Sequence, residues 1–400
     1  MSLTTLPAIS PTAFEDTSVA FAAKSDYQLR KTYWLFAMMN RPGLVNLGTF
    51  FIKLALRLHL PIKKLIRNTI YEQFCGGETI RECESTIRQL SESGIGTILD
   101  YSIEGEDEEV VFDETTAELL RTIDRAATSQ DIPFTVFKVS GIAPNDLLEK
   151  VQAEGDLSPE DQKAYERVVA RVEQLCSQAH LRTVRIFFDA EESWIQEVID
   201  DLAYSMMARY NSRQAIVFNT YQLYQHEVLE AYKSAYLEAR KNNYILGGKL
   251  VRGAYMEKER IRARENNYRN PIQATKADTD RDYDAAIDFS LEHIDFIEFC
   301  LGTHNEASCL HCANKMQATG LKSGDPRVWF AQLLGMSDNL SYNLAKLGYN
   351  VAKYVPYGPI DSVMPYLFRR AEENKSIAGQ SSREFLLVKR EMKRRKLGAV

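Results

Sequence analysis

The sequence lacks the features that define several classes of protein. No uncharged run is long enough to span a bilayer, and no secretory signal peptide is visible. The first residues include Glu15 and Asp16 and little arginine, unlike a mitochondrial transit peptide. A net charge of −6 argues against general nucleic-acid binding. These absences predict a cytoplasmic protein.

The sequence also lacks a recognisable nucleotide or metal motif. Neither G-x-G-x-x-G nor a Walker A sequence follows any predicted strand, which argues against an open doubly wound sheet. The six cysteines are expected to be reduced thiols. Cys309 and Cys312 have zinc-like spacing, but they fall within a predicted helix and have no second ligand pair. We therefore predict no metal site.

What the sequence does contain is a regular alternation of short β-rich runs and longer runs with helical period. Eight strand–helix pairs in about 280 residues match a (βα)8 barrel in number and length. The predicted strands are 96–101, 134–139, 184–189, 215–219, 248–252, 296–301, 328–334 and 351–355. The predicted helices are 115–130, 159–180, 194–210, 228–242, 283–293, 306–319, 339–347 and 362–373.

Polar residues gather where these strands end. Strand ends of a barrel face one mouth, and catalytic residues come from several of them. The polar strand-end residues are Lys138, Ser140, Asp189, Asn219, Gln222, Arg252, Thr303, His304, Asn305 and Tyr354. The stretch 249–255 (KLVRGAY) reads as a buried strand that delivers a cation and a glycine at its end, which suits an anionic ligand.

Segments outside the barrel have two open interpretations. Residues 1–93 are expected to be a disordered start followed by a helical arm over 34–74, with a stop at Pro61. The apolar part, 45–60, carries only Lys53 and Arg57 as full charges, so it either packs on the barrel or lies on a membrane surface. The basic tail 389–396, within a C-terminal helical segment 377–400, is either a solvated helix face or a contact for anionic lipid.

Five ordered motifs resemble proline dehydrogenases, most closely the monofunctional type of eukaryotic mitochondria. They are 249–260 (KLVRGAYMEKER), 302–305 (GTHN), 332–336 (QLLGM), 353–359 (KYVPYGP) and 366–374 (YLFRRAEEN). The resemblance implies a (βα)8 barrel over 94–376 that binds FAD and oxidises L-proline to Δ1-pyrroline-5-carboxylate. It also implies a quinone electron acceptor, peripheral contact with the inner face of a membrane, and a separate pyrroline-5-carboxylate dehydrogenase for the next step.

The resemblance also assigns individual residues. Arg369 and Arg370 would bind the substrate carboxylate, Asp189 would orient Lys138, and Tyr354 and Tyr366 would wall the proline ring. The full catalytic set is Lys138, Asp189, Tyr354, Tyr366, Arg369 and Arg370. The cofactor set is Asn219, Lys249, Val251, Arg252, Gly253, Ala254, Tyr255, Lys276, Thr303, His304, Asn305 and Glu373.

Three other functions stay open on the sequence alone. A hydroxyproline-oxidising relative would share most motifs, although the bulk of Tyr354 favours proline. A flavin barrel of the folate reductase type would need NAD(P)H, and the arginine pair suits a small carboxylate better. A non-enzymatic membrane or scaffold protein would bind no chromophore.

Overall fold

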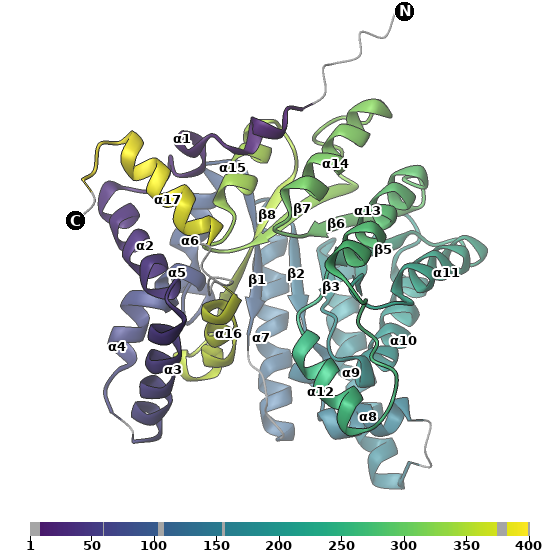
Figure 1. The fold of residues 1–400 in the computed structure, drawn as a ribbon. Coiled ribbons are helices and arrows are strands. Elements are labelled where there is room, and N and C mark those ends of the chain that lie inside the picture. The colour runs from purple at the N-terminus through teal and green to yellow at the C-terminus, as the bar shows by residue number, and fades with distance from the viewer. Residues whose placement is uncertain (1–8, 59, 103–107, 154–156, 374–381, 399–400) are drawn as a thin grey trace, which may run out of the picture.

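The centre of the molecule is a closed barrel of eight parallel strands (Figure 1). The computed structural model describes residues 9–58, 60–102, 108–153, 157–373 and 382–398. Each strand pairs with the next in sequence, and β1 pairs with β8 to close the barrel. The predicted (βα)8 barrel is confirmed. Its strands are β1 (Ile95–Tyr101), β2 (Phe134–Phe137), β3 (Arg185–Phe188), β4 (Val217–Gln222), β5 (Leu246–Val251), β6 (Ile297–Gly302), β7 (Val328–Leu333) and β8 (Val351–Tyr357).

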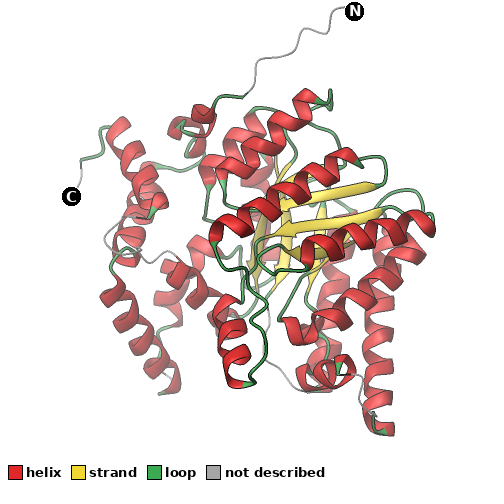
Figure 2. Ribbon diagram, turned by 45° about the vertical axis from the view of Figure 1, so that its right-hand side comes forward, coloured by secondary structure: helices red, strands yellow, loops and turns green. Residues whose placement is uncertain are grey.

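Helices surround the strands on all sides (Figure 2). Local sequence sets their ends: Ser158 caps α9 by accepting a hydrogen bond from the Asp161 amide at 3.0 Å, and a proline occupies the first turn. The helices are α6 (Ile80–Ser91), α7 (Glu109–Ala127), α8 (Asn145–Gln152), α9 (Pro159–Arg182), α10 (Ser193–Tyr210), α11 (Val228–Lys241), α12 (Met256–Glu265), α13 (Lys276–Glu292), α14 (Glu306–Ala318), α15 (Asp338–Lys346) and α16 (Ile360–Glu373), with a 3-10 turn η3 (Val139–Gly141) after β2.

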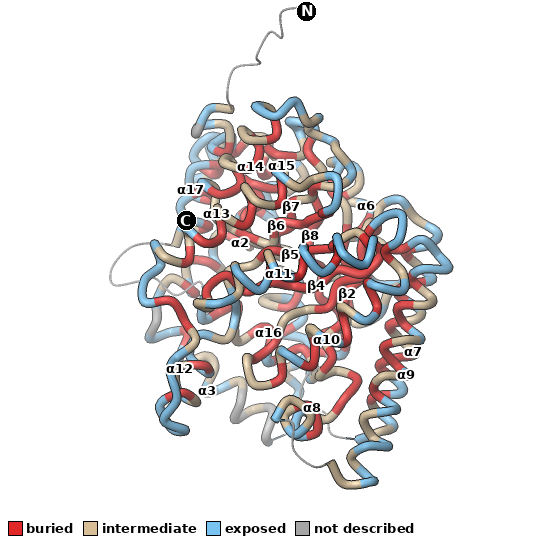
Figure 3. The backbone as a smooth tube through the Cα atoms, turned by 90° about the vertical axis from the view of Figure 1, so that its right-hand side faces the viewer, coloured by how far each residue is buried: buried red, intermediate tan, exposed pale blue. Residues whose placement is uncertain are grey.

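Strand alternation divides the core into two layers. Side chains such as Ile98, Val136, Phe187 and Ala352 pack together as a core inside the barrel. The alternate strand residues pack against the surrounding helices in a second, larger core. Figure 3 shows the buried residues concentrated in the strands and on the inner sides of the helices.

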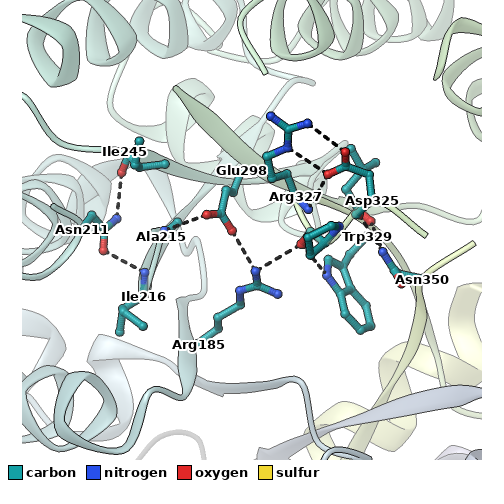
Figure 4. Close-up of polar contacts among 12 residues, drawn as sticks. Arg185, Asn211, Ala215, Ile216, Ile245, Glu298, Asp325, Arg327, Trp329 and Asn350 are labelled. Atoms are coloured by element: carbon teal, nitrogen blue, oxygen red, sulfur yellow. Dashed lines mark hydrogen bonds and ion pairs between the residues drawn. The ribbon is translucent and has the colours of Figure 1, made fainter. Parts of the chain in front are cut away.

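The amino end of the barrel is closed by polar side chains (Figure 4). Glu298 of β6 forms an ion pair with Arg185 of β3 at 2.9 Å and accepts the Ala215 amide at 3.0 Å. Arg185 and the Trp329 indole both donate to the Pro326 carbonyl, each at 3.1 Å. This end is therefore filled and cross-linked, which leaves the opposite end for a ligand.

An arm and a tail pack together beside the barrel as a third core. The arm contains η1 (Pro11–Phe14), α1 (Thr17–Ala20), α2 (Asp26–Met39), α3 (Pro42–Arg57), α4 (Lys63–Ile66), η2 (Arg67–Tyr71) and α5 (Glu72–Phe74), and the tail is α17 (Arg383–Arg394). The Asn40 side chain on the arm accepts the Ser382 amide at 2.8 Å, so the two segments are joined just before α17 begins. Among the described residues, no helix has the length and apolar character needed to cross a membrane.

One expectation outside the barrel needs correction. Residues 9–30 were expected to be disordered, but Phe14 is fully buried and its carbonyl accepts from Asn339 at 3.1 Å. Residues 1–8 lie outside the described part. The basic side chains of the tail do lie on a solvated face of α17, with Arg390 and Arg394 56% and 52% exposed, while the opposite face of the helix buries Leu387, Val388 and Met392. An apolar stripe within a charged sequence explains how this helix packs.

Candidate active site

A cavity of about 860 Å³ opens at the carboxyl ends of the strands. It brings together residues from all five predicted motifs, although 332–336 contributes only Gln332 and Leu333, and 353–359 contributes only Tyr354. Helices α8, α12 and α16, which follow β2, β5 and β8, lie near this end (Figure 1). The predicted residues that line the cavity are Lys138, Asp189, Lys249, Val251, Arg252, Gly253, Ala254, Tyr255, Lys276, Thr303, His304, Asn305, Tyr354, Tyr366, Arg369, Arg370 and Glu373.

A buried ion pair lies on the cavity floor. Lys249 is 4% exposed, and its ammonium contacts the Asp189 carboxylate and donates to the Tyr354 hydroxyl at 2.6 Å. The Tyr354 hydroxyl in turn donates to Asp189 at 3.2 Å. Burial, followed by the nearby Asp189 charge, raises the pKa of Tyr354 well above its usual value, so the phenol stays protonated. Asp189 was expected to orient Lys138, but the side chains it contacts directly are Lys249 and Tyr354.

A second charged group comes from α16. Arg370 forms an ion pair with Glu373 at 2.6 Å, and its guanidinium lies 5.0 Å from the centre of the Tyr366 ring. Arg369 also lines the cavity. Burial raises the pKa of Glu373, while Arg370 and Arg369 oppose that rise. The Tyr366 hydroxyl is buried and has no hydrogen-bond partner among the described residues, so it is available to a ligand.

Cations and helix starts meet on the β5–β6 side. Arg252 donates to Asp280 at 2.8 Å, to the Thr303 hydroxyl at 2.8 Å and to the Ser308 hydroxyl at 3.0 Å. Lys276, the first residue of α13, pairs with the same Asp280 at 2.5 Å. Because these cations lie beside a helix N-terminus, they form a region of positive potential that suits an anion.

Asn305 and His304 connect the cavity to its supporting structure. Asn305 caps α14 by accepting the amides of Ala307 and Ser308 at 2.9 and 3.2 Å. The Nδ1 atom of His304 lies 2.9 Å from the Ser337 hydroxyl. Burial, with smaller contributions from Lys353 and Arg370, lowers the pKa of His304 to about 3, so the imidazole is neutral.

Gly253 lets the backbone pass close to an aromatic wall. Its φ of +138° is accessible mainly to glycine, and a Cβ there would lie 2.4 Å from the Tyr224 ring. The neighbouring Tyr255 amide donates to the Tyr224 hydroxyl at 3.3 Å. The loop after β5 is thus held at the cavity with its backbone accessible.

Asn219 is the one predicted site residue that does not reach the cavity. It is fully buried, and its amide donates to Asp200 of α10 at 2.8 Å, on the outer side of the barrel. The predicted strand 215–219 was too short. Because β4 continues to Gln222, Thr220 and Gln222 line the cavity in its place. Gln222 was already expected at this strand end, and the period of two along a strand would have added Thr220 once the boundary was known.

Sequence reasoning also missed several lining residues. Asp100 lies on a strand where no charge cluster or glycine drew attention to it, and Gln332 was recognised only as part of the motif 332–336, not as a site residue. Glu191, two residues past Asp189, is buried and accepts the Ser140 amide at 2.9 Å and the Ser140 hydroxyl. Burial raises the pKa of Glu191 to about 7, against the opposing effect of Lys138. This carboxyl therefore joins the ends of β2 and β3 behind the cavity.

Comparison with known proteins gives a consistent result. The proline dehydrogenase family model matches residues 83–383. The carbapenem antibiotics biosynthesis protein CarD of Pectobacterium carotovorum subsp. carotovorum is 36% identical over 83% of this chain and 85% of its own. The mitochondrial proline dehydrogenase 1 of Dictyostelium discoideum is 32% identical over 95% of this chain and 74% of its own.

A solved structure supports the fold. The crystal structure of proline utilization A from Bdellovibrio bacteriovorus, inactivated by N-propargylglycine, superposes with a TM-score of 0.71 at 18% identity. The match covers 94% of this chain but 40% of that one, so this chain spans less than half the length of that protein.

A closed parallel barrel with a polar, partly charged cavity at its strand ends has the architecture of a barrel enzyme. The family match extends across most of that barrel and includes every strand. The chain belongs to the proline dehydrogenase family.

Proposed function

We propose that the protein oxidises L-proline to Δ1-pyrroline-5-carboxylate with FAD as its cofactor and passes the electrons to a membrane quinone. The observation that supports this most is the single cavity in which Arg369, Arg370, Tyr354 and Tyr366 meet the cations and helix starts of the β5–β6 side. One half suits a small carboxylate, and the other suits a phosphate-bearing cofactor.

The residues present fit FAD in three respects. A cavity of about 860 Å³ is within the size range of cofactor sites. Arg252 and Lys276 offer positive charge for the two phosphates, and the backbone at Gly253 is accessible for close contact. Thr303, Asn305 and Glu373 offer hydrogen-bonding groups for ribose or ring atoms. Bound there, FAD would supply the two-electron acceptor for the reaction.

The remaining groups would bind and orient the substrate. Proline is a zwitterion, so its carboxylate needs a cation, and Arg370 is buried within reach of the cavity with Glu373 as its present partner. Tyr354 and Tyr366 supply aromatic walls for the ring. The substrate loses a hydride from carbon and a proton from nitrogen, and the C=N bond forms between them. The ion pair of Lys249 and Asp189 fixes the hydroxyl of Tyr354 and so the position of its ring.

Substrate choice can be tested directly. The purified protein should be yellow, and L-proline should bleach its flavin absorbance under anaerobic conditions with formation of an imine detected by mass spectrometry. trans-4-Hydroxy-L-proline should reduce the flavin more slowly, because the two hydrogen bonds on Tyr354 keep its ring from moving aside. Reduction by NAD(P)H but not by proline would favour a folate reductase type of activity and overturn the proposal, as would a colourless protein that binds no added FAD.

We also propose that the arm contacts an anionic membrane surface, where a quinone would be available. Residues 27–71 contain eight Lys or Arg and no Asp or Glu, although the chain as a whole has a charge of −6. On α3, Leu44, Leu47, Phe50 and Phe51 are 46 to 60% exposed. Apolar side chains flanked by basic ones are typical of helices that lie in the membrane interface. Ion pairs reduce the positive charge of both segments: Lys31, Lys63 and Arg67 of the arm pair with carboxylates outside 27–71, and Arg394 and Arg395 of the tail pair with the buried Glu391.

A liposome co-sedimentation series tests the membrane proposal. We expect salt-sensitive binding to anionic vesicles and little binding to zwitterionic ones. The double change Phe50→Ser and Phe51→Ser should weaken binding at least tenfold, since burying each phenylalanine is favourable by about 1.5–3 kcal/mol. The matched control is Leu237→Ser on α11, also an exposed apolar residue but 65% exposed on the barrel's helical wall. Equal loss in both variants would refute a specific role for α3.

A further inference from the structure

The tail helix α17 supplies two charged side chains to the region of the cavity, and it lies almost entirely beyond the family match, which ends at residue 383. Arg383 lines the cavity and forms an ion pair with Glu306, which lines it too. The next residue, Glu384, is 8% exposed and turns inward. Its carboxylate accepts the Ser337 amide at 2.8 Å and lies 3.4 Å from the Ser337 hydroxyl.

Ser337 connects this carboxylate to the cavity wall. Its hydroxyl lies between Glu384 and His304, whose Nδ1 atom is 2.9 Å away. Ser337 has a φ of +50°, an uncommon conformation for a non-glycine residue that the surrounding contacts must hold. His304 lines the cavity, and no hydrogen bond to its other ring nitrogen, Nε2, occurs within the described residues.

The charge state of Glu384 determines which group donates in each hydrogen bond of the series Glu384–Ser337–His304. A charged carboxylate can only accept hydrogen bonds, so the Ser337 hydroxyl donates to it. The Ser337 oxygen must then accept from His304, which places the single proton of the neutral imidazole on Nδ1. Nε2 is left with a lone pair. A protonated Glu384 can donate instead, and the order then reverses, so that Nε2 carries the proton.

We propose that Glu384 is a positioning residue that acts through Ser337 to hold His304 in the Nδ1–H tautomer, so that Nε2 accepts a hydrogen bond from a hydroxyl or N–H group of the bound cofactor. The identity of that cofactor as FAD rests on the proposed function, whereas the tautomer itself does not. The tail is thus part of the site, although it follows the barrel in sequence and approaches it through contacts with the arm.

The surroundings of Glu384 make the effect dependent on pH. The pKa of Glu384 is raised to about 7, mainly by burial and in part by Asp338, against the opposing effects of the Ser337 amide, Lys353 and Arg383. His304 stays neutral across this range, because its pKa is near 3. The Nδ1–H tautomer should therefore dominate above pH 8 and give way to the Nε2–H tautomer towards pH 6.

The test is nitrogen NMR of the histidine side chains in the full chain, recorded with and without added FAD. The chain has only six histidines, and a His304→Gln spectrum identifies the signal. At pH 8.5 the wild type should show a protonated Nδ1, and Glu384→Gln should shift His304 towards a protonated Nε2 and remove the pH dependence. Ser337→Ala should also remove the pH dependence of the tautomer, although the backbone N–H at position 337 can still donate its hydrogen bond to Glu384. An unchanged His304 tautomer in both variants would overturn the proposal.

Glu391→Gln is the matched control, because Glu391 is a fully buried carboxylate on the same helix that binds Arg394 and Arg395 rather than Ser337. It should loosen α17 about as much as Glu384→Gln does, yet leave the tautomer unchanged. In FAD titrations, Glu384→Gln should weaken binding roughly 2- to 13-fold, the range for one hydrogen bond, and Glu391→Gln should not. If the wild type bound no FAD, the proposed function would fail while the NMR result still decided the role of Glu384.

Discussion

A buried ion pair lies at each end of the barrel interior, and the two pairs allow a matched test of the cavity. Lys249 and Asp189 have side chains that are 5% and 17% exposed at the cavity end. Arg185 and Glu298 are 19% and 10% exposed at the closed end. Removing one partner of a buried pair leaves an uncompensated charge, which costs about 3–5 kcal/mol. Lys249→Met, Asp189→Asn, Arg185→Met and Glu298→Gln should therefore each lower the free energy of unfolding.

Double variants separate the interaction energy of each ion pair from the cost of burying a single unpaired charge. Lys249→Met with Asp189→Asn leaves no charge behind, so it should be more stable than the sum of the single changes predicts, by about 2 kcal/mol. The same should hold for Arg185→Met with Glu298→Gln. Urea unfolding of the ligand-free chain, followed by circular dichroism, gives these values. Strict additivity at the cavity end would refute the view that Lys249 and Asp189 compensate each other.

Ligand binding then distinguishes the two ends. The Tyr354 hydroxyl depends on Lys249 and Asp189 for its orientation, with hydrogen bonds of 2.6 and 3.2 Å. The cavity-end double variant should therefore reduce kcat/KM for proline by at least tenfold, since hydrogen bonds to charged groups contribute about 1.5–3 kcal/mol. The closed-end double variant should keep kcat/KM within about twofold, because the Arg185 pair lies on the side opposite the cavity. Equal loss of activity at both ends would show that stability alone explains the effect.

Three further outcomes are expected. Arg370→Met should raise KM for proline roughly 10- to 150-fold, the range for a charge-assisted hydrogen bond, and leave FAD content unchanged; Arg390→Met, at an exposed pair with Glu15, should not. Gly253→Ala should lower FAD affinity measured by fluorescence titration, because a Cβ 2.4 Å from Tyr224 must displace the loop. Glu191 has a folded pKa of about 7, above its usual 4.5, so its contribution to stability is full below pH 4.5 and is lost as pH rises through 7. Glu191→Gln should flatten the decline of unfolding free energy over that window, by roughly 3 kcal/mol at about 1.4 kcal/mol per pKa unit; an unchanged slope would contradict this assignment.

The barrel could be predicted because its signal is repeated. Each strand is a short apolar run followed by a helix, and the polar residues after each run gather at one mouth by topology alone. The end of β4 could not be read in the same way. Its last residues are held by polar contacts: Thr220 donates to the Phe188 carbonyl at 2.6 Å, and Gln222 donates to the Glu191 carbonyl at 2.7 Å. Polar side chains in a strand look like a loop in sequence, so Asn219 was placed at an end it does not occupy.

The contacts of the tail with the cavity region could not be predicted from its sequence. Its sequence reads as a charge run, and nothing local indicates that Glu384 reaches Ser337, 47 residues earlier. The buried Glu391 is neutralised by Arg394 and Arg395 from its own helix, which is a local pattern that could have been recognised. Contacts within one helix are thus readable from spacing, whereas contacts between a tail and a loop depend on how the arm positions the tail.

The alternation of side chains along β3 places one charged residue near each end of the barrel interior. On β3, Arg185 and Phe187 face the barrel interior, and Asp189 follows at the next alternate position. The apolar Phe187 lies between two charges, and each charge meets an opposite one from another strand, Glu298 of β6 or Lys249 of β5. A charged side chain that is largely buried inside a barrel is costly without such a partner, because it has lost most of its contact with water. A lysine on an inward position, such as Lys249, therefore predicts an inward carboxylate in the same layer. Applied to the sequence together with the strand period, that rule offers Asp189 two inward lysines, Lys138 and Lys249, and the structure shows that the ion pair forms with Lys249.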